Sequence, residues 1–550
     1  MSAAETLLGA VILLPLLGAL VTALVPKGAG TARRKASAAP GPRAWAGLTA
    51  AMGTAACSIA LTWYVAAKET AVTLAVGGWD VPLGLRLLAD GTGAMFVALT
   101  GIVGAAASVV AAVMPGATGS DGRAQPAFWP LWLGCWTGLN TVYLSGDIFN
   151  AYVGLELAGL TAVGLVALGG RAAWAAAFRY LVVTVVGSML FLVAVGLIVS
   201  ETGTLDFRMA AEHITAVVEG TGAVPVAVVV AVLLGTAGMA LKFALAPLHG
   251  WLIPAHSSAP SVVSPLLSAL VIKAPLLVLF RLWLWVADDS AALTIAAWIL
   301  GAMGAAALLW GSVMALRQTR LKKLVAYSTV AQAGYWVIAL PVIIHPEAAG
   351  DDLPGTGAED TVLFWVLTGT MALIAAHGLA KAALFLVAGL LKERYGTDDL
   401  EDLAGAGRAH PALAMTAGLA AVTLAGLPPS LAFGGKWQLV TGAVMADQWW
   451  LLGTVVVSTL LSAGYLLRIL APIFRDTGDD GGTSDATSDA IANATAAVST
   501  DGDSRVATAA VGPPIPVTAA GAALALAVLS VAAGFAVVHF DALLQVGGPS

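Results

Sequence analysis

The sequence predicts an all-α polytopic membrane protein with about fourteen transmembrane helices. The first observation behind this prediction is composition, since 59% of the 550 residues are hydrophobic and only 11% are charged, with a mean hydropathy of +0.89. The second is that apolar runs of about 20 residues, the length that a helix needs to cross a bilayer, recur along the chain. The third is that basic and acidic loops alternate between these runs. The lipid bilayer is therefore the first expected partner.

The apolar runs give the positions of the expected spans. They lie near residues 7–25, 45–66, 88–113, 127–145, 148–168, 175–199, 225–247, 258–284, 292–316, 323–343, 361–391, 410–432, 434–472 and 513–538. The run at 434–472 divides into the tail of a broken helix and a full span at 449–472. The first run has Glu5 and no basic residue ahead of it, whereas a signal peptide starts basic, so we expect a true span.

The distribution of Lys and Arg predicts the orientation. Basic residues gather in loops of one parity: Lys27, Arg33, Arg34, Lys35 and Arg43, then Arg171 and Arg179, then Arg317, Arg320, Lys322 and Lys323, then Lys392, Arg394 and Arg408. Loops of the other parity are acidic, as in 201–219 and 347–360. The positive-inside rule makes the basic set cytoplasmic. We expect a multi-pass protein of the cell (plasma) membrane with both termini extracytoplasmic, and Arg179, Lys322 and Lys323 as simple topology anchors.

One segment does not have the composition of a membrane span. Residues 476–504 are acidic, rich in Ser, Thr and Gly, and almost without large apolar side chains, which predicts disorder. The chain is therefore expected to divide into five parts. They are 1–113 with spans 1–3, 114–284 with a first repeat of spans 4–8, 285–475 with a second repeat of spans 9–13, a disordered acidic cytoplasmic linker at 476–512, and 513–550 with span 14.

Charged residues occur deep inside several apolar runs. Lys242, Lys273 and Lys436 are flanked by apolar sequence, and Glu156 lies within NAYVGLELAGLTAVGLVAL. A lone charge at that depth costs roughly 3 kcal/mol or more. Lys273 is near the middle of its span and cannot extend its ammonium group to either membrane surface. Such charges predict the movement of protons or other ions through the membrane.

Two of these lysines lie next to prolines. Lys242 precedes Pro247 in span 7, and Lys436 follows Pro428 and Pro429 in span 12. Proline removes a backbone donor and blocks the preceding turn, so each helix is expected to be broken. Membrane helices also carry proline routinely, but inverted-repeat transporters build ion sites at such breaks. Two breaks five spans apart predict two inverted five-helix repeats, each with a broken helix.

Enzymatic chemistry is not indicated. Cys57 and Cys135 both lie in apolar spans, and there is no CxxC pair and no Cys/His cluster, so neither a disulfide framework nor a metal site is expected. The sequence has no nucleotide-binding glycine motif and no nucleophile–base pair. We therefore expect no catalytic residue, no cofactor and no nucleic-acid partner.

Several motifs carry a resemblance to a known family. They are LADGTGAMF, SGDIFNAYVGLELAGL with Glu156, LKFALAPLHGWLIPAHSSAPSVVSPLLSALVIKAPLLVLFRL with Lys242 and Lys273, RLKKLVAYSTVAQAGYW, HGLAKAALFLVAG with His377 and Lys381, and GLPPSLAFGGKWQLV with Lys436. In this order and spacing, over roughly residues 85–470, the chain resembles the antiporter-like subunits shared by Mrp-type multisubunit Na⁺/H⁺ antiporters, respiratory complex I and membrane-bound hydrogenases. One departure is WLIPAH, where the family usually has WLPDAH; His256 stays in register.

The resemblance implies a proton path. Glu156 and Lys242 would form a coupling pair, Lys273 would carry the proton toward the centre, and His256 would be a bridge. His377 and Lys381 would continue the path, and Lys436 would pass the proton outward. A histidine suits such a relay because its pKa lies near neutral pH, although a lone buried histidine is as often a structural donor. The same holds for a buried carboxyl such as Glu156 between helices.

Among subfamilies the chain resembles the D-type subunits of Mrp antiporters most closely, which implies other membrane subunits as partners and a monovalent cation, expected to be Na⁺, exchanged for H⁺. A proton-pumping subunit of a complex I-like NADH:quinone oxidoreductase or hydrogenase is the alternative. No long amphipathic helix follows span 14, so we expect a subunit other than the largest one of complex I. A second alternative is an autonomous carrier for an organic solute, which predicts hydroxyl and aromatic groups at both breaks.

Overall fold

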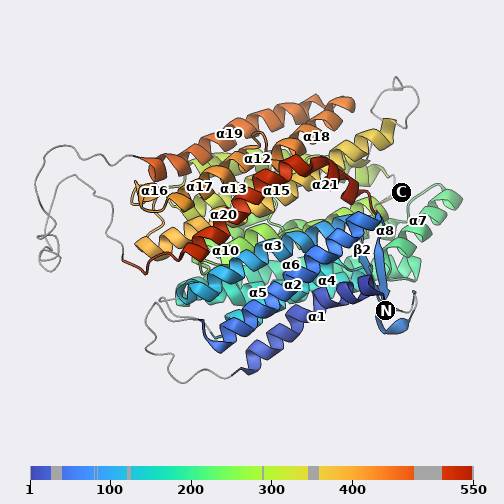
Figure 1. Ribbon diagram of the computed structural model, residues 1–550. Coiled ribbons are helices and arrows are strands. Elements are labelled where there is room, and N and C mark those ends of the chain that lie inside the picture. The colour runs from blue at the N-terminus through green and yellow to red at the C-terminus, as the bar shows by residue number, and fades with distance from the viewer. Residues whose placement is uncertain are drawn as a thin grey trace, which may run out of the picture.

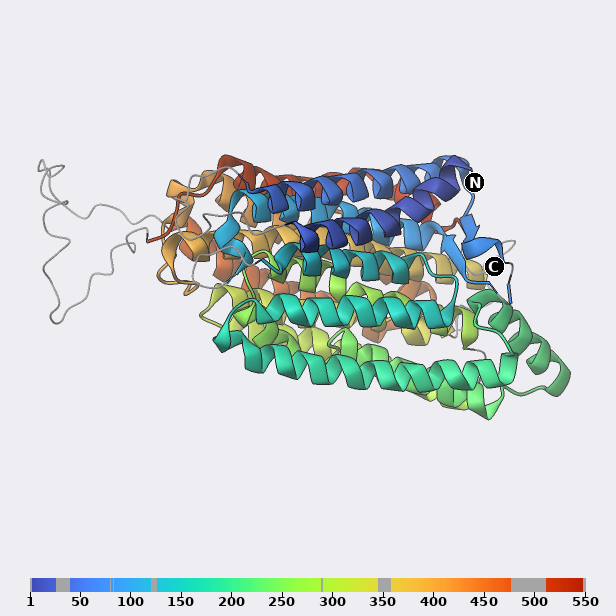
Figure 2. The same cartoon turned by 90° about the horizontal axis from the view of Figure 1, so that it is seen from below.

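The computed structural model describes residues 2–25, 40–79, 81–82, 84–119, 126–287, 290–344, 358–475 and 511–547. The molecule is a bundle of long helices that run side by side along one direction (Figures 1 and 2). Within the described residues, eleven helices are long and apolar enough to cross a membrane. Three further crossings are made by shorter helices, so the predicted all-α polytopic fold is confirmed. The linker at 476–512 lies outside the described residues except for its last two.

The described spans follow the predicted apolar runs. Spans 1–6 are α1 (Ala3–Leu24), α2 (Pro42–Lys68), α3 (Gly91–Val113), α4 (Phe128–Tyr143), α5 (Ile148–Ala167) and α6 (Arg171–Thr202). Spans 9–11 are α12 (Ala291–Leu316), α13 (Leu321–Val337) with α14 (Leu340–Ile344), and α15 (Ala358–Tyr395). Spans 13 and 14 are α19 (Trp449–Phe474) and α20 (Val517–Ala532) with α21 (Val537–Leu544). The labelled N and C ends lie at the same end of the bundle (Figure 1), as an even number of crossings requires.

Both predicted helix breaks are present. In span 7, α8 (Val226–Lys242) ends at Lys242, and the chain continues through η4 (Leu248–Trp251) into α9 (Leu252–Ser258). In span 12, α17 (Pro411–Ala425) is followed by Gly426, whose φ of +72° ends the helix, and α18 (Leu431–Met445) begins five residues later. Each break contains the prolines noted in the sequence, whose missing N–H groups cannot continue the helical ladder.

Helix pairings recur in the two halves of the bundle. In the first half α4 packs on α5 and α6 packs on α8. In the second half α12 packs on α13 and α15 packs on α18. Since five crossings separate the corresponding helices, the second set runs in the opposite direction. The division into repeats at 114–284 and 285–475 stays a prediction that this pattern supports.

Span 8 lies inside the bundle and is not a regular α-helix. It consists of α10 (Val263–Leu266), the π-helical turn η5 (Leu267–Val271), α11 (Lys273–Arg281) and a second π-helical turn, η6 (Leu282–Val286). Pro275 has no N–H for the carbonyl of Val271, four residues earlier, so the α-helical ladder is interrupted there. Widened turns of this kind are frequent at functional sites. The irregularity places Lys273 at the first position of α11.

Two further elements have no counterpart in the sequence prediction. A two-stranded antiparallel hairpin, β1 (Val72–Ala75) and β2 (Arg86–Ala89), precedes α3. The short helix α7 (Phe207–Thr221) connects spans 6 and 7 and extends beyond the bundle at the end that carries both termini (Figure 2). Both are too short or too polar to give an apolar run of membrane length.

Candidate ion-translocation site

The seven residues predicted from the sequence all lie in the interior or at its edge. Lys273, Lys381 and His256 are 0% exposed, His377 is 2%, Lys242 is 6% and Lys436 is 7%. Glu156 is the most accessible, with 22% of its side chain exposed. The residues come from spans 5, 7, 8, 11 and 12, so packing of helices, not sequence proximity, brings them together.

Glu156 and Lys242 form an ion pair between α5 and α8. The Nζ atom of Lys242 lies 3.3 Å from Oε1 of Glu156 and donates a 3.1 Å hydrogen bond to the hydroxyl of Thr184 on α6. The hydroxyl of Ser188, one turn along α6, donates to the same Glu156 oxygen. Lys242 is the last residue of α8, where the negative end of the helix dipole favours a cation. The predicted pair is thus in contact, held by two hydroxyls that the sequence did not single out.

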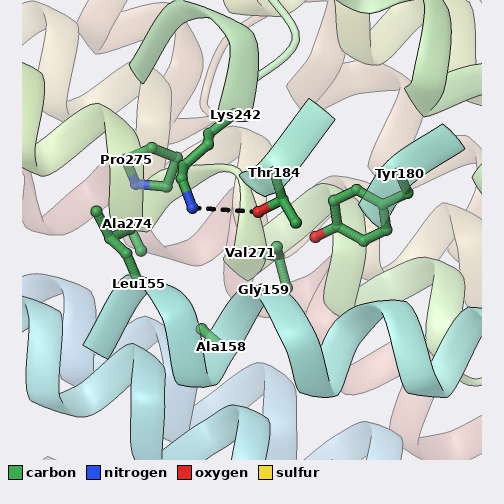
Figure 3. A pocket seen from close by; sticks show the side chains of 9 residues that line it. All are labelled: Leu155, Ala158, Gly159, Tyr180, Thr184, Lys242, Val271, Ala274 and Pro275. Carbon is green, nitrogen blue, oxygen red and sulfur yellow. Dashed lines mark hydrogen bonds between the residues drawn. The ribbon is translucent and has the colours of Figure 1, made fainter. Parts of the chain in front are cut away.

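A small cavity adjoins this pair. It has a volume of about 20 Å³ and is lined by Leu155, Ala158, Gly159, Tyr180, Thr184, Lys242, Val271, Ala274 and Pro275 (Figure 3). Roughly 10–15 Å³ is enough for one water molecule. The Lys242 ammonium group points into the space between α6 and the irregular part of span 8 (Figure 3). The cavity therefore leads from the ion pair toward the turn that precedes Lys273.

Lys273 and His377 meet at the centre of the bundle. The Nζ atom of Lys273 lies 2.8 Å from Nδ1 of His377 on α15 and 3.2 Å from the carbonyl oxygen of Ser268. Trp336 covers the pair, with its ring 4.3 Å from Nζ of Lys273 and edge-on to the imidazole. No carboxylate balances this lysine among the described contacts. A hydrogen-bonded amine and imidazole can share one proton, which makes the pair suited to proton transfer.

Lys381 lies one turn further along α15. Its Nζ atom donates a 2.9 Å hydrogen bond to the carbonyl of Val325 and a second to the hydroxyl of Ser328, both on α13. The neighbouring Thr329 hydroxyl is 2.8 Å from the Ser268 hydroxyl of span 8. Hydroxyl groups of α13 therefore connect the surroundings of Lys381 to those of Lys273.

His256 has a different environment. Its ring stacks on Phe385 of α15 at 4.5 Å, and neither ring nitrogen has a hydrogen-bond partner among the described residues. None of its described contacts joins it to Lys242 or Lys273, so its role as a bridge between them stays a prediction. Burying polar nitrogens without partners costs stability, which suggests that this imidazole is kept for more than packing.

Lys436 closes the series on the far side of span 12. Its Nζ atom donates to the carbonyl of Ala425, 2.9 Å away at the break, and to the hydroxyl of Thr459, 2.8 Å away on α19. The ring of Tyr335 lies 5.2 Å from the ammonium group, and its hydroxyl contacts Ser458 at 2.6 Å. A helix C-terminus, a hydroxyl and an aromatic face all favour a cation here.

One sequence prediction is wrong. The sequence predicts a topology anchor at Lys322 on the cytoplasmic surface, but this residue is 1% exposed and its Nζ atom donates a 3.1 Å hydrogen bond to the carbonyl of Ala259. The basic run RLKKL does not distinguish the buried Lys322 from its neighbours Arg320 and Lys323, which remain at least partly exposed. The helical phase of α13 decides which of adjacent lysines turns inward.

A second charged group, not predicted as part of the site, lies at the end of the bundle that holds the termini. Arg281 of span 8 contacts Asp90 at 3.3 Å, and both side chains are 4% exposed. Asp90 also caps α3 by accepting from the N–H of Gly93 at 2.6 Å. Arg86 pairs with Asp206 at 2.6 Å nearby. The first pair fixes the end of span 8 to the start of α3, and the second fixes the hairpin to the start of α7.

Comparisons with known proteins give a consistent result. The family described as NADH:quinone oxidoreductase/Mrp antiporter, TM, matches residues 145–349 and 361–462. The N subunit of the NADH-quinone oxidoreductase of Desulforudis audaxviator is 34% identical over 395 residues, which cover 72% of this chain and 74% of the relative. The D subunit of the Na⁺/H⁺ antiporter of Alkalihalophilus pseudofirmus is 28% identical over 402 residues, covering 73% and 76%.

Solved structures show the same fold. A chain of the Mrp complex from Dietzia sp. matches with a TM-score of 0.77 and 24% identity, covering 100% of this chain and 98% of that one. A chain of respiratory complex I from Thermus thermophilus matches with a TM-score of 0.72 and 22% identity, covering 98% and 100%. The arrangement of fourteen crossings is therefore shared across these membrane complexes.

Proposed function

Because this chain belongs to the NADH:quinone oxidoreductase/Mrp antiporter transmembrane family, we propose that it is the ion-translocating subunit of a multisubunit Na⁺/H⁺ antiporter. The observation that carries the proposal is the Lys273–His377 pair, a fully buried amine and imidazole 2.8 Å apart with no carboxylate to balance them among the described contacts. Such a pair does not stabilise the fold, since burying either group in its charged form costs several kcal/mol. In a proton path, by contrast, the amine and the imidazole provide two adjacent sites that can bind a proton in turn.

The proposed path has three parts. The Glu156–Lys242 pair is the first, and its cavity leads to span 8. Lys273 with His377 is the second. Lys273 donates to the backbone carbonyl of Ser268, whose hydroxyl contacts Thr329 on α13, the helix to which Lys381 donates its hydrogen bonds. Lys436 at the second break is the third. A proton that arrives at one part changes the stability of the charge at the next, because charges interact strongly in a low dielectric.

The assembly is part of the proposal. The A. pseudofirmus relative is named as one subunit of a Na⁺/H⁺ antiporter, and the Dietzia sp. structure is of an Mrp complex. We propose that this chain also works with partner membrane subunits in the plasma membrane, with the basic loops cytoplasmic and both termini outside, and that H⁺ and Na⁺ are its transported ions.

A proton-pumping subunit of a complex I-like oxidoreductase is the second candidate. It is favoured by one specific observation, the 34% identity to the N subunit of a NADH-quinone oxidoreductase. The two candidates share the same path and differ in what drives it. Genes for small antiporter subunits beside this one would favour the first, and genes for flavin and iron–sulfur subunits would favour the second.

Exchange in membrane vesicles tests the proposal. The chain is co-expressed with its operon partners, and Na⁺-induced dequenching of a ΔpH-sensitive dye is measured for the wild type and for Lys273→Ala. Lys273 is fully buried and forms no ion pair among the described residues. We therefore expect its replacement to abolish exchange while assembly stays near normal. The matched control is Lys323→Ala, which changes a partly exposed lysine at the start of α13 and should leave exchange unchanged. Full exchange by Lys273→Ala would contradict the proposal.

A further inference from the structure

The helix α15 carries a row of contacts of which the proposed path uses only the first two. Positions 377, 381, 385, 389 and 393 follow one another at intervals of four residues, which moves each contact by roughly 40° around the helix. The first two are His377 and Lys381. The next three are Phe385, Gly389 and Glu393, which lead from the buried centre to the end of α15 opposite both termini (Figure 1).

Each of these three positions touches the end of span 7, which comprises α9 and the turn after it. Phe385 stacks on the ring of His256. Gly389 lies against Ser261, so closely that a Cβ atom at 389 would be 2.8 Å from Cβ of Ser261. Glu393 accepts a 2.7 Å hydrogen bond from the hydroxyl of Ser261. The turn that follows α9 is therefore held against α15 by a carboxylate at the surface and an imidazole inside.

Lys322 stands on the other side of the same turn. It donates to the carbonyl of Ala259 and is close enough to Lys392, Glu393 and Asp398 to interact with them electrostatically. Both Lys322 and Lys381 also interact electrostatically with His256. Because the imidazole stacks on Phe385, it lies at the level of α15 between Lys381 and Glu393.

We propose that Glu393, Ser261 and Lys322 form an access port, through which Lys381 exchanges protons with the aqueous phase by way of His256. The proposal rests on the proposed function. At the port the Glu393 carboxylate takes a proton from the aqueous phase and passes it to one ring nitrogen of His256, which returns Glu393 to a carboxylate. The imidazolium then gives the proton on its other ring nitrogen to the neutral Lys381 amine and is left as a neutral imidazole; the steps run in reverse for release. Phe385 occupies the direct route along α15, and the buried imidazole that stacks on it is a titratable group at that level of the helix.

The geometry fits an access port better than a purely structural clamp. Glu393 is half-buried and can meet water, whereas Lys381 and His256 cannot. Lys322 and Lys392 bring positive charge to this end of the port, and Asp398 opposes them where α13 begins, paired with Arg320 at 3.2 Å. A clamp would need neither a titratable partner for Ser261 nor an imidazole with both nitrogens free.

The test compares Glu393→Gln, Glu393→Asp and Glu401→Gln in the co-expressed complex, in everted vesicles whose medium bathes the cytoplasmic ends. The amide of Glu393→Gln can still accept from Ser261 but cannot titrate. We expect Glu393→Gln to lower exchange at least tenfold, most strongly at alkaline pH of the medium, where protons are scarce. Glu393→Asp should recover part of the rate, and the exposed Glu401→Gln should match the wild type.

A pair of glycine variants tests the same port without changing a charge. A methyl group in Gly389→Ala would push Ser261 away, whereas a methyl group in Gly418→Ala meets nothing within 4 Å. Gly389→Ala should show the same alkaline loss as Glu393→Gln, and Gly418→Ala should not. An unchanged rate and pH profile in Glu393→Gln would overturn the proposal, and so would an equal loss at every pH that aspartate does not repair. If Lys273→Ala keeps full exchange, the proposed function fails; if only the port variants are unaffected, the port alone fails.

Discussion

At the scale of single residues, substitutions at Glu156 can show whether its charge is needed for exchange or whether a hydrogen-bonding side chain of the same shape is enough. Glu156→Gln keeps the shape of the side chain and its contact with Ser188, but it leaves the buried ammonium without its anion. We expect exchange to fall by roughly 100-fold or more, in the range for loss of a proton-transfer group. Glu156→Asp keeps the charge at a longer distance and should retain part of the rate. Vesicle dequenching assays measure both.

The control for these variants is Glu201→Gln, at the exposed end of α6 and outside the path. It should exchange like the wild type. Equal and full activity of the Gln and Asp variants at position 156 would show that this carboxyl group only joins α5 to α6. The stability of the assembled complex on heating should be recorded in parallel. Removing one partner of a fully buried pair costs roughly 3–5 kcal/mol, and the 22% exposure of the Glu156 side chain makes the cost here smaller.

At the scale of elements, the packing of α6 on α8 decides whether the pair can form. A Cβ atom at Gly187 would lie 2.7 Å from the carbonyl oxygen of Gly238 and 3.0 Å from Cγ of Lys242. Gly187→Ala should therefore separate the helices and lower both exchange and the unfolding temperature, at a cost of roughly 1–3 kcal/mol. Gly196→Ala on the same helix meets nothing within 4 Å and is the matched control. Identical melting curves for the two variants would contradict this account.

The irregular turn of span 8 gives another element-scale prediction. Pro275→Ala restores the N–H that the carbonyl of Val271 lacks and should let the π-helical turn before Lys273 relax toward an α-helix. The relaxation would rotate Lys273 away from His377, so we expect strongly reduced exchange with normal assembly. Pro472→Ala, in α19 and away from the path, should have little effect. Wild-type exchange by Pro275→Ala would show that the turn does not position Lys273.

The membrane-spanning helices and their breaks can be predicted from the sequence, because apolar run length and proline determine them within a few residues of the chain. Fourteen crossings and two breaks follow from run length and from missing N–H groups. The contacts of the site depend on the rotation of each helix, which an almost uniformly apolar span does not encode. Lys322 is therefore misassigned as an anchor, and the hydroxyls of Thr184 and Ser328 do not stand out among many membrane serines and threonines. The π-helical turn has a visible signal in Pro275, whose consequence needs the surrounding packing.

At the scale of the whole molecule, the isolated chain leaves part of its path uncovered. The side chain of Glu156 is 22% exposed, and the neighbouring surface of α5 carries Phe149, Val153 and Leu160, each 43–50% exposed. A carboxylate that faces lipid is costly, whereas a partner subunit on this surface would cover it. The exposure of Glu156 on this surface of α5 thus agrees with a complex in which another membrane subunit covers it.

The last prediction follows from this incomplete cover and from the lack of any driving domain in the described chain. On the proposed function, the energy for exchange comes from an ion gradient or from neighbouring subunits. Expressed alone, the chain should insert stably, since its fourteen crossings form one packed bundle, but it should give no Na⁺-dependent dequenching of a ΔpH dye. Co-expression with its operon partners should restore the signal, and Lys273→Ala in that background should abolish it again. Robust Na⁺/H⁺ exchange by the purified single chain in liposomes would instead identify a self-sufficient carrier, because no partner would then be needed to cover Glu156 or to complete the Na⁺ path.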